Sequence, residues 1–352
     1  MLTISITNVR ITPEMLSVIS NIDSFNASWK YMAGMEPERL GSLKKIATIE
    51  SIGSSNRIEG NRLSDREVET LLSRVGMESF ATRDEQEVAG YARLMDDLYD
   101  HFEILPLTEN YIRQFHQILL SWSDKDTRHR GEYKNVSNSV VAYGPGGEEL
   151  GVVFETASPF ETPEQMRYLV RWMNEAIEGK TLHPLLLIGI FIVHFLAIHP
   201  FQDGNGRLSR ALNALLLLKA GYSYIPYISL ETVIEESKEA YYRSLHQTQT
   251  SFKGKKPDYA PWLTFFLRSM LKQKQRLEKK IPVETSADLS PNELRIMDLF
   301  TGKPQWALRE IAQASAMNVN TAKKALKSLV EKQRLALHGK GRSACYRQSA
   351  VS

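Results

Sequence analysis

The sequence is poor in cysteine and in long apolar runs. Its 352 residues include a single cysteine, Cys345. One thiol can form neither a disulfide within the chain nor a cysteine-based zinc site, which fits a reducing compartment. The longest apolar run extends over residues 185–193, well short of the ~20 residues that a membrane-spanning helix needs. The run therefore predicts a buried core helix, and we expect no membrane contact.

The start of the chain also lacks a basic stretch followed by an apolar segment, so no secretory leader is expected. The sequence contains no internal repeat and no low-complexity tract. With 42% apolar and 24% charged residues, its composition is typical of a soluble globular protein, here of two or three domains. We accordingly expect a soluble cytoplasmic protein.

Charge is distributed unevenly along the chain, although the net charge is only +3. Residues 281–352 contain 11 Lys and Arg against 6 Asp and Glu, whereas the preceding residues contain 33 against 35. The basic excess therefore lies in the C-terminal segment, where it can attract an acidic partner.

Helical patterns dominate the sequence before residue 280. Apolar periodicity predicts helices over, among others, residues 36–56, 64–76, 84–103, 110–121, 162–178, 184–198, 207–220, 230–252 and 260–278. Ser64 followed by Glu67 predicts a capping box, and Gly221 is well placed to end the helix before it. Two β-rich runs around a Gly-Pro-Gly-Gly turn predict a hairpin over residues 140–154. The hairpin pattern alone does not separate a passive surface feature from a functional one.

Residues 199–210, HPFQDGNGRLSR, connect the apolar helix to a second helix. Gly204 and Gly206 permit a positive φ and a close backbone approach, and unpaired N–H groups at a helix start bind anions. Arg207 and Arg210 lie three positions apart and so share one side of that helix. This turn therefore predicts a phosphate site.

Two further residues of the same turn add chemistry. Asp203 offers the hard oxygen that Mg²⁺ takes together with substrate phosphate and water. His199 can accept a proton near neutral pH. Taken singly, each residue favours an ordinary glycine turn between core helices, with His199 only capping the first helix; together they indicate a phosphate-and-magnesium site.

This segment resembles the signature of the Fic family, His-x-Phe-x-(Asp/Glu)-Gly-Asn-Gly-Arg-x-x-Arg, at every specified position. The resemblance implies a mainly α fold, a Fic-type helical bundle with a small β-hairpin flap. It also implies a protein adenylyltransferase that moves AMP from ATP to a Tyr, Thr or Ser hydroxyl of a target protein, or of the chain itself. ATP would be the substrate and Mg²⁺ the cofactor. The hairpin over 140–154 would be the flap, pairing with an extended segment of the target by strand addition.

The resemblance also implies a role for each matching position. His199 would be the general base, Asp203 would hold Mg²⁺, and Phe201 would anchor the loop in the core. The residues that would bind the phosphates of ATP are Gly204, Asn205, Gly206, Arg207 (on the β-phosphate) and Arg210 (on the γ-phosphate). Tyr241, and less strongly Glu235, would contact the adenine; the alternative for Tyr241 is a core aromatic at helical spacing.

A second motif lies upstream. Ser55, Glu59 and Gly60 match (Ser/Thr)-x-x-x-Glu-(Gly/Asn), which resembles the inhibitory motif of many Fic proteins. On a helix Ser55 and Glu59 are one turn apart. The resemblance implies that Glu59 pairs with Arg210 and takes the place of the γ-phosphate, since one carboxylate competes with one phosphate for a guanidinium. The alternative is a helix end with an ordinary surface glutamate.

The domain organisation expected from these patterns has four parts. Residues 1–100 would be an N-terminal helical region with an inhibitory helix at about 45–60. The Fic catalytic core would cover residues 101–280, and 281–290 would be a linker. Residues 291–352 resemble a winged helix-turn-helix with a recognition helix over 318–329.

The region 315–347 contains eight Lys and Arg and one acidic residue, Glu331. Such a charge suits DNA phosphates. The expected contacts are Asn320, Thr321, Lys323, Lys324 and Lys327. A winged helix used for protein contact or for a homodimer is an open alternative.

Two alternatives to the adenylyltransferase also stay open. One is a DNA-binding regulator whose Fic body only senses nucleotide. The other is a Fic enzyme that removes AMP or transfers another phosphate-linked group, because a carboxylate near Mg²⁺ can also position water.

Overall fold

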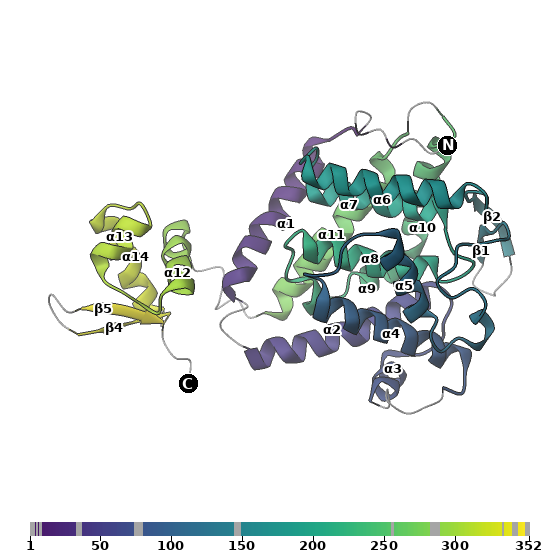
Figure 1. Cartoon of the computed structure of the whole chain (residues 1–352). Helices are drawn as coiled ribbons and strands as arrows, with labels where there is room; N and C mark the ends of the chain where they lie inside the picture. The colour runs from purple at the N-terminus through teal and green to yellow at the C-terminus, as the bar shows by residue number, and fades with distance from the viewer. Residues whose placement is uncertain are drawn as a thin grey trace. The chain divides into compact units, whose positions relative to one another are not determined.

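The chain is mainly helical, as predicted (Figure 1). The computed structural model describes residues 4, 6, 9–32, 37–73, 80–143, 149–254, 257–281, 289–332, 334–339 and 344–348. The chain divides into two compact units, Met1–Asp23 with Gly41–Arg276, and Ser24–Leu40 with Leu277–Ser352. The predicted domain boundaries at residues 100, 280 and 290 stay predictions. No helix in the described ranges has the length and apolar character needed to cross a membrane.

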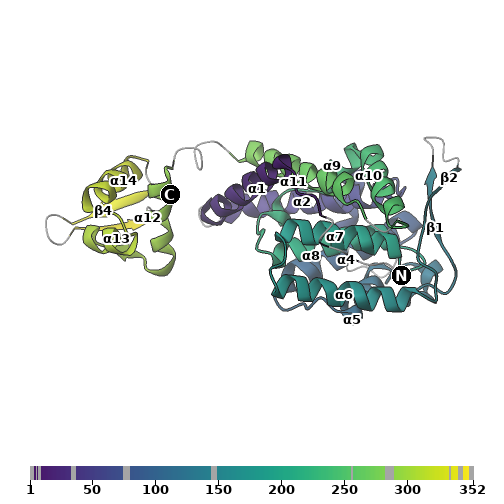
Figure 2. The ribbon, with the colours of Figure 1, turned by 90° about the horizontal axis from the view of Figure 1, so that it is seen from above.

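The elements before the C-terminal segment are α1 (Pro13–Met32), α2 (Pro37–Ile58), α3 (Asp65–Leu72), α4 (Arg83–His101), α5 (Glu109–Leu119), the 3-10 helix η2 (Asp124–Asp126), β1 (Ser139–Tyr143), β2 (Glu149–Glu155), α6 (Thr162–Glu178), α7 (Pro184–Ile198), α8 (Asn205–Lys219), the 3-10 helix η3 (Ile225–Tyr227), α9 (Glu231–Glu236), α10 (Lys238–Ser251) and α11 (Ala260–Lys280). Figure 2 shows α7 between α6 and α10, and α7 also contacts α8. The helices around α7 thus position the segment that joins α7 to α8.

The centre of the first unit is α7. Every residue from Leu185 to Ile198 is buried, because a helix that is apolar all round can lie only in a core. The sequence predicted this helix with its observed bounds. In α8, residues 207–218 are buried too, Arg207 and Arg210 among them. Two buried helices therefore meet at the turn that contains the candidate site.

Several local predictions are confirmed, and one helix needs correction. Ser64 and Glu67 form the predicted capping box, and Gly221 follows α8 with a φ of 89°. The helix predicted over 230–252 is two helices, α9 and α10, separated at Ser237. Ser237 Oγ donates a hydrogen bond to the carbonyl of Val233 (2.6 Å). A serine bound to its own backbone in this way favours a break in the helix.

The predicted hairpin is present as the antiparallel pair β1 and β2. Ser139 lies opposite Glu155, and the register shifts after Val140 and after Ala142. β2 contacts α10. The turn between the strands, residues 144–148, lies outside the described residues.

The C-terminal segment contains α12 (Pro291–Gly302), β3 (Gln305–Trp306), α13 (Leu308–Ala314), α14 (Val319–Glu331), β4 (Leu335–His338) and β5 (Cys345–Gln348). Its core packs Ile296, Ile311, Leu326 and Leu329 together with their neighbours. The strands form an antiparallel sheet in the order β3-β5-β4, whereas the sequence predicted two strands. The two-residue strand β3 is too short for a periodic signal. The winged-helix identity stays our interpretation.

Candidate active site

The turn between α7 and α8 depends on two residues in the left-handed region. His199 ends α7 with a φ of 52° and donates its backbone N–H to the carbonyl of Phe195 (2.9 Å). Gly204 precedes α8 with a φ of 78°. A positive φ is uncommon for a residue with a Cβ and carries a conformational cost. The surrounding contacts must therefore hold His199 in this backbone conformation.

Asn205 and Phe201 fix the interior of the turn. The Asn205 side chain accepts the N–H of Phe201 (2.9 Å) and donates to its carbonyl (2.7 Å). Phe201 is fully buried, as predicted, and stacks on His116 at 3.8 Å between ring centroids. Both polar atoms of the Asn205 side chain thus serve the turn itself.

The fixed ring of His116 supports the turn from α5. Its Nδ1 accepts the N–H of Gly131 (3.0 Å), so Nε2 must carry the proton that it shares with the carbonyl of Asp203 (3.0 Å). Burial lowers the pKa of His116 to about 4. The imidazole is therefore neutral at pH 7, and the sequence motifs did not reveal its role.

His199 lies partly exposed at the end of α7. Burial of the ring lowers its pKa to about 4, and the charge of Lys134 acts in the same direction, against Glu59 and Asp203. Its Nδ1 has no hydrogen-bond partner among the described residues. An imidazole that is neutral at pH 7 is able to accept a proton.

Arg207 is almost fully buried, at 2% exposure. Its contacts are loose ion pairs: Nη1 lies 3.5 Å from Glu87 Oε2, and Nη2 lies 3.5 Å from Asp203 Oδ1. Its Nε and Nη1 make no hydrogen bond within the described residues. Arg83 of α4 contacts the same two carboxylates, at 2.8 Å from Glu87 and 3.4 Å from Asp203. The sequence motifs do not include Arg83 and Glu87, whose spacing marks only an ordinary i,i+4 pair.

Arg210 is held far more tightly. Its Nε donates to Ser55 Oγ (2.8 Å), and its Nη2 donates to the Ser55 carbonyl (2.7 Å) and to Glu59 Oε1 (2.8 Å). Burial lowers the pKa of Arg210, but the charge and hydrogen bond of Glu59, together with Tyr241 and Tyr91, raise it overall. The structure thus brings together the three residues that the two sequence motifs paired.

Glu59 follows the last residue of α2 rather than lying inside the helix. Its carboxylate packs against the start of α8, so that a Cβ added to Gly206 would lie 2.0 Å from Glu59 Oε1. Only glycine at position 206 leaves room for a carboxylate, or for a phosphate of similar bulk.

Polar contacts anchor α2 to α9 over two turns. The pairs are Ser51 with Glu231 (2.8 Å), Ser54 with Thr232 (3.1 Å) and Arg57 with Glu235 (2.7 Å). Arg57 also donates to Asp65 (2.9 Å). Glu235, predicted as a weak adenine contact, is therefore engaged by Arg57. No sequence motif predicted this anchor, because Ser51 and Glu231 lie 180 positions apart.

Tyr241 lies in an aromatic group, with ring centroids 5.1 Å from Tyr242 and 5.8 Å from Trp262. It is 4% exposed, and burial raises its pKa to about 12. The same side chain interacts with Arg210. Tyr241 is thus a core aromatic that also borders the arginine.

The donors and acceptors of the turn fit a phosphate and a hard cation. Arg207 and Arg210 both keep buried guanidinium nitrogens without hydrogen bonds to the described residues, which suits an anion. Asp203 is the carboxylate of the turn; burial raises its pKa, but Arg207 and its neighbours lower it overall. No group of three or more His, Cys, Asp or Glu in the described residues forms a metal cluster. A cation at Asp203 would thus take further ligands from substrate and water, as Mg²⁺ does.

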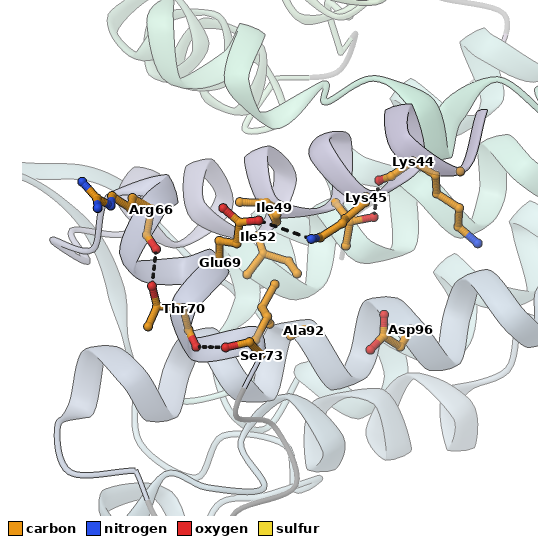
Figure 3. Close-up of a pocket in the computed structure, with 13 residues that line it drawn as sticks. Lys44, Lys45, Ile49, Ile52, Arg66, Glu69, Thr70, Ser73, Ala92 and Asp96 are labelled. Carbon is orange, nitrogen blue, oxygen red and sulfur yellow. Dashed lines mark hydrogen bonds and ion pairs between the residues drawn. The ribbon is translucent and has the colours of Figure 1, made fainter. Parts of the chain in front are cut away.

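A separate cavity of about 730 Å³ lies along α2, α3 and α4 (Figure 3). It is lined by Ile52 and Ala92, and the exposed pair Lys45–Glu69 (3.3 Å) lies across it. No residue of 199–210 lines it. The candidate site is therefore the α7–α8 turn and not this cavity.

Residues 106–217 match the model of the Fic/DOC family. The chain is 28% identical over 184 residues to the protein adenylyltransferase Fic of Drosophila melanogaster, covering 51% of this chain and 34% of the relative. A probable protein adenylyltransferase of Aquifex aeolicus is 30% identical over 111 residues, covering 32% of this chain and 34% of that protein. The chain thus spans about a third of the length of these curated relatives.

Solved structures share the fold of this chain. A Fic family protein from Desulfovibrio desulfuricans has a TM-score of 0.64 at 20% identity, over 98% of both chains. A Fic domain containing signaling protein from Bacteroides thetaiotaomicron has a TM-score of 0.60 at 26% identity, over 74% of this chain and 97% of that one. The fold and the matching turn together define a Fic domain. Residues 106–217 thus contain a Fic domain, as the sequence motif predicted.

Proposed function

We propose that this chain is a protein adenylyltransferase that restrains itself through Glu59. The observation that carries the proposal is the difference in hydrogen bonding between the two buried arginines. Arg207 keeps free donors beside the turn, while Ser55 and Glu59 occupy Arg210. The site offers two arginines to a polyphosphate, and one of them, Arg210, is already bound by Glu59. This arrangement is expected of a transferase that is inactive until Glu59 moves away. The names of the relatives support the same activity.

In the proposed reaction, the oxygen of a protein hydroxyl attacks the α-phosphorus of ATP. The bond from that phosphorus to the bridging oxygen breaks, and pyrophosphate leaves with the electron pair. The neutral imidazole of His199 takes the hydroxyl proton. Arg207 and the backbone around Gly204 and Gly206 bind the β-phosphate, and Arg210 binds the γ-phosphate once Glu59 has moved away. When bound at Asp203, Mg²⁺ would neutralise phosphate charge.

The target protein is proposed to dock on the hairpin of β1 and β2. A two-stranded sheet leaves backbone groups of both outer edges available for another strand. An extended segment of the target, or a segment of a second copy of this chain, would present its hydroxyl beside His199 in this way. Self-modification is then one outcome of the same docking.

Labelling with ATP radioactive at the α-phosphate tests the proposal, using the Glu59→Gly protein alone and with a cell lysate. We expect labelled protein in both samples, more than with the unaltered chain. The double variant Glu59→Gly, His199→Ala should label nothing. Glu103→Gly is the matched control, since Glu103 is an exposed glutamate just after the end of α4.

Labelling that survives the loss of His199 would refute the assignment of the base. The mass added to a labelled protein separates AMP transfer from transfer of another phosphate-linked group. Incubating that labelled protein with the unaltered chain tests AMP removal, in which Glu59 would position water instead of blocking ATP.

A second function is proposed for the C-terminal segment, namely binding of duplex DNA through α14. Lys323 and Lys324 are exposed on this helix and form no ion pair with any described residue. Lys327 shares the face in a loose pair with Glu331 (3.7 Å). Unpaired lysines on one helix face are suited to phosphate contacts.

Duplex binding by the full chain at several salt concentrations tests this function. Replacing Lys323 and Lys324 by Glu should abolish binding, whereas Lys180→Glu in the other unit should leave it unchanged. If the double variant instead alters the molar mass in sedimentation and the unaltered chain binds no duplex, α14 is a protein contact, a homodimer included.

A further inference from the structure

Lys134 is a buried lysine without a carboxylate hydrogen-bond partner among the described residues. It is 4% exposed. Its Nζ donates to Asn138 Oδ1 (2.9 Å), to Thr156 Oγ1 (2.8 Å) and to the carbonyl of Ile198 (3.0 Å). An ammonium has three donors, and all three are thus used on neutral oxygens. Burial lowers the pKa of Lys134 to about 8, so the group is still mostly charged at pH 7.

These three oxygens belong to three different segments. Asn138 immediately precedes β1, and Thr156 immediately follows β2. Ile198 is the last residue of α7, whose C-terminal carbonyls carry a partial negative charge that favours a cation. Lys134 therefore joins both strand ends at the base of the hairpin to the end of the central helix.

The same group of residues binds the backbone on both sides of His199. Lys134 takes the carbonyl of Ile198 through Nζ and that of Pro200 through its own N–H (2.8 Å). Asn138 Nδ2 donates to the carbonyl of Phe201 (2.8 Å). Hydrogen bonds to the carbonyls of Ile198, Pro200 and Phe201, on both sides of His199, thus hold its left-handed backbone. Thr156 completes the group by donating to the carbonyl of Asn138 (2.5 Å).

We propose that Lys134 is a positioning residue that clamps the base of the hairpin to the catalytic turn, so that the hairpin and the His199 imidazole keep one fixed relation. Lys134, Asn138 and Thr156 form this clamp. The inference rests on the proposed function, in which the hairpin holds the acceptor segment and His199 takes its proton. A hydroxyl carried on the hairpin then reaches His199 at a distance set by the clamp, and small misplacements of reacting groups slow transfer strongly.

If Lys134 had only a structural role, an apolar residue could serve in its place. Burying an ammonium without a carboxylate is costly, and apolar replacements of buried charges are often neutral or stabilising. The charge also has an electrostatic consequence, because Lys134 opposes protonation of His199 while Glu59 and Asp203 favour it. Loss of the charge should therefore move the titration of His199, which a purely structural role does not predict.

The test compares Lys134→Met, Lys134→Arg and Thr156→Val, each made in the Glu59→Gly chain. The control is Lys180→Met, a change at an exposed lysine between α6 and α7. Self-labelling rates are measured against ATP concentration, and the His199 ring is titrated by NMR. We expect Lys134→Met to lower the rate at saturating ATP by at least about tenfold, with the KM for ATP within about threefold. The His199 pKa should rise toward its ordinary value of about 6.5.

Thr156→Val separates geometry from charge, because it removes one contact of the clamp and keeps the ammonium. It should slow labelling while leaving the His199 titration close to that of the parent. The clamp is refuted if Lys134→Met folds and changes neither the labelling rate nor the titration, or if labelling falls only with the folded fraction. If the Glu59→Gly parent labels nothing, the proposed function fails, and the titration still decides whether Lys134 acts on His199.

Discussion

The two arginines of α8 lie three positions apart and are both buried, yet their surroundings differ. On the α4 side of the turn, Arg207 faces Glu87 and Asp203 at 3.5 Å and keeps nitrogens free. On the α2 side, Arg210 donates three hydrogen bonds of 2.7–2.8 Å to Ser55 and Glu59. Arg207 thus keeps two nitrogens without hydrogen bonds to the described residues, whereas Arg210 keeps only Nη1.

The two sides of the turn therefore hold their arginines in different ways. In the proposed function, Arg207 on the α4 side binds a phosphate, and Glu59 on the α2 side must leave Arg210 before ATP binds. Regulation of that kind would act on α2, whose own anchor to α9 ends in the Arg57–Glu235 pair. The predictions below test whether the two sides are as separate as their contacts suggest.

The largest effect is expected on the α4 side. Glu87→Ala removes the carboxylate shared by Arg83 and Arg207 and leaves a buried guanidinium with less compensation. We expect the free energy of unfolding to fall by about 3 kcal/mol, measured by urea denaturation. Glu69→Ala, at an exposed ion pair, should change it by less than about 0.5 kcal/mol. Equal losses of unfolding free energy in Glu87→Ala and Glu69→Ala would show that the carboxylate beside Arg207 stabilises the fold no more than an exposed ion pair does.

The second effect is on ATP affinity at the α2 side. Glu59→Gly frees Arg210 for the nucleotide, and a hydrogen bond to a charged group contributes about 1.5–3 kcal/mol. We expect the Kd for ATP, measured by calorimetry in a His199→Ala background, to fall by about tenfold or more. Glu103→Gly should leave the Kd unchanged. An unaltered Kd in the Glu59 variant would mean that Arg210 does not contact the nucleotide.

A smaller effect should follow from loosening the anchor of α2. Arg57→Ala breaks the contacts to Glu235 and Asp65 but leaves Ser55 and Glu59 in the chain. The inhibitory helix end should be released part of the time, raising ATP-dependent labelling about fivefold, equivalent to about 1 kcal/mol. Lys45→Ala, which removes an exposed ion pair between α2 and α3, should not raise labelling. Labelling as strong as with Glu59→Gly would show that the anchor between α2 and α9 alone keeps Glu59 on Arg210.

The smallest effect concerns His116, which supports the turn from α5. Its folded pKa of about 4 lies below the ordinary value, so the unfolded chain binds the proton more strongly. The stability due to this histidine is present above pH 6.5 and is lost as the pH falls toward 4. Between pH 7 and pH 6 we expect a loss of about 0.7 kcal/mol that is absent in His116→Gln. Identical pH dependence of unfolding in both proteins would contradict the lowered pKa.

Much of the site was predictable because its signals are local. The apolar run over 185–193 predicted α7, and the glycines of the turn predicted an anion site at the start of α8. The partner of Arg210 was also predicted, but from the family resemblance, since no local rule joins Glu59 to a residue 151 positions away. The roles of Glu87, His116 and Lys134 were not predicted, because an acid, a histidine and a lysine are ordinary residues on any helix or loop until packing places them.

The sequence by itself determined that α7 is buried and that the chain turns at residues 199–204, and it predicted a phosphate site in this turn. These properties follow from apolar content, from glycine's conformational freedom and from the charges of neighbouring residues. Only the tertiary structure decided which arginine is free and which is occupied. It also decided that Glu235 binds Arg57 and that Lys134 ties the hairpin to His199. Such choices depend on distances between segments far apart in the chain, and a guanidinium or ammonium binds whichever acceptors the fold brings within about 3 Å.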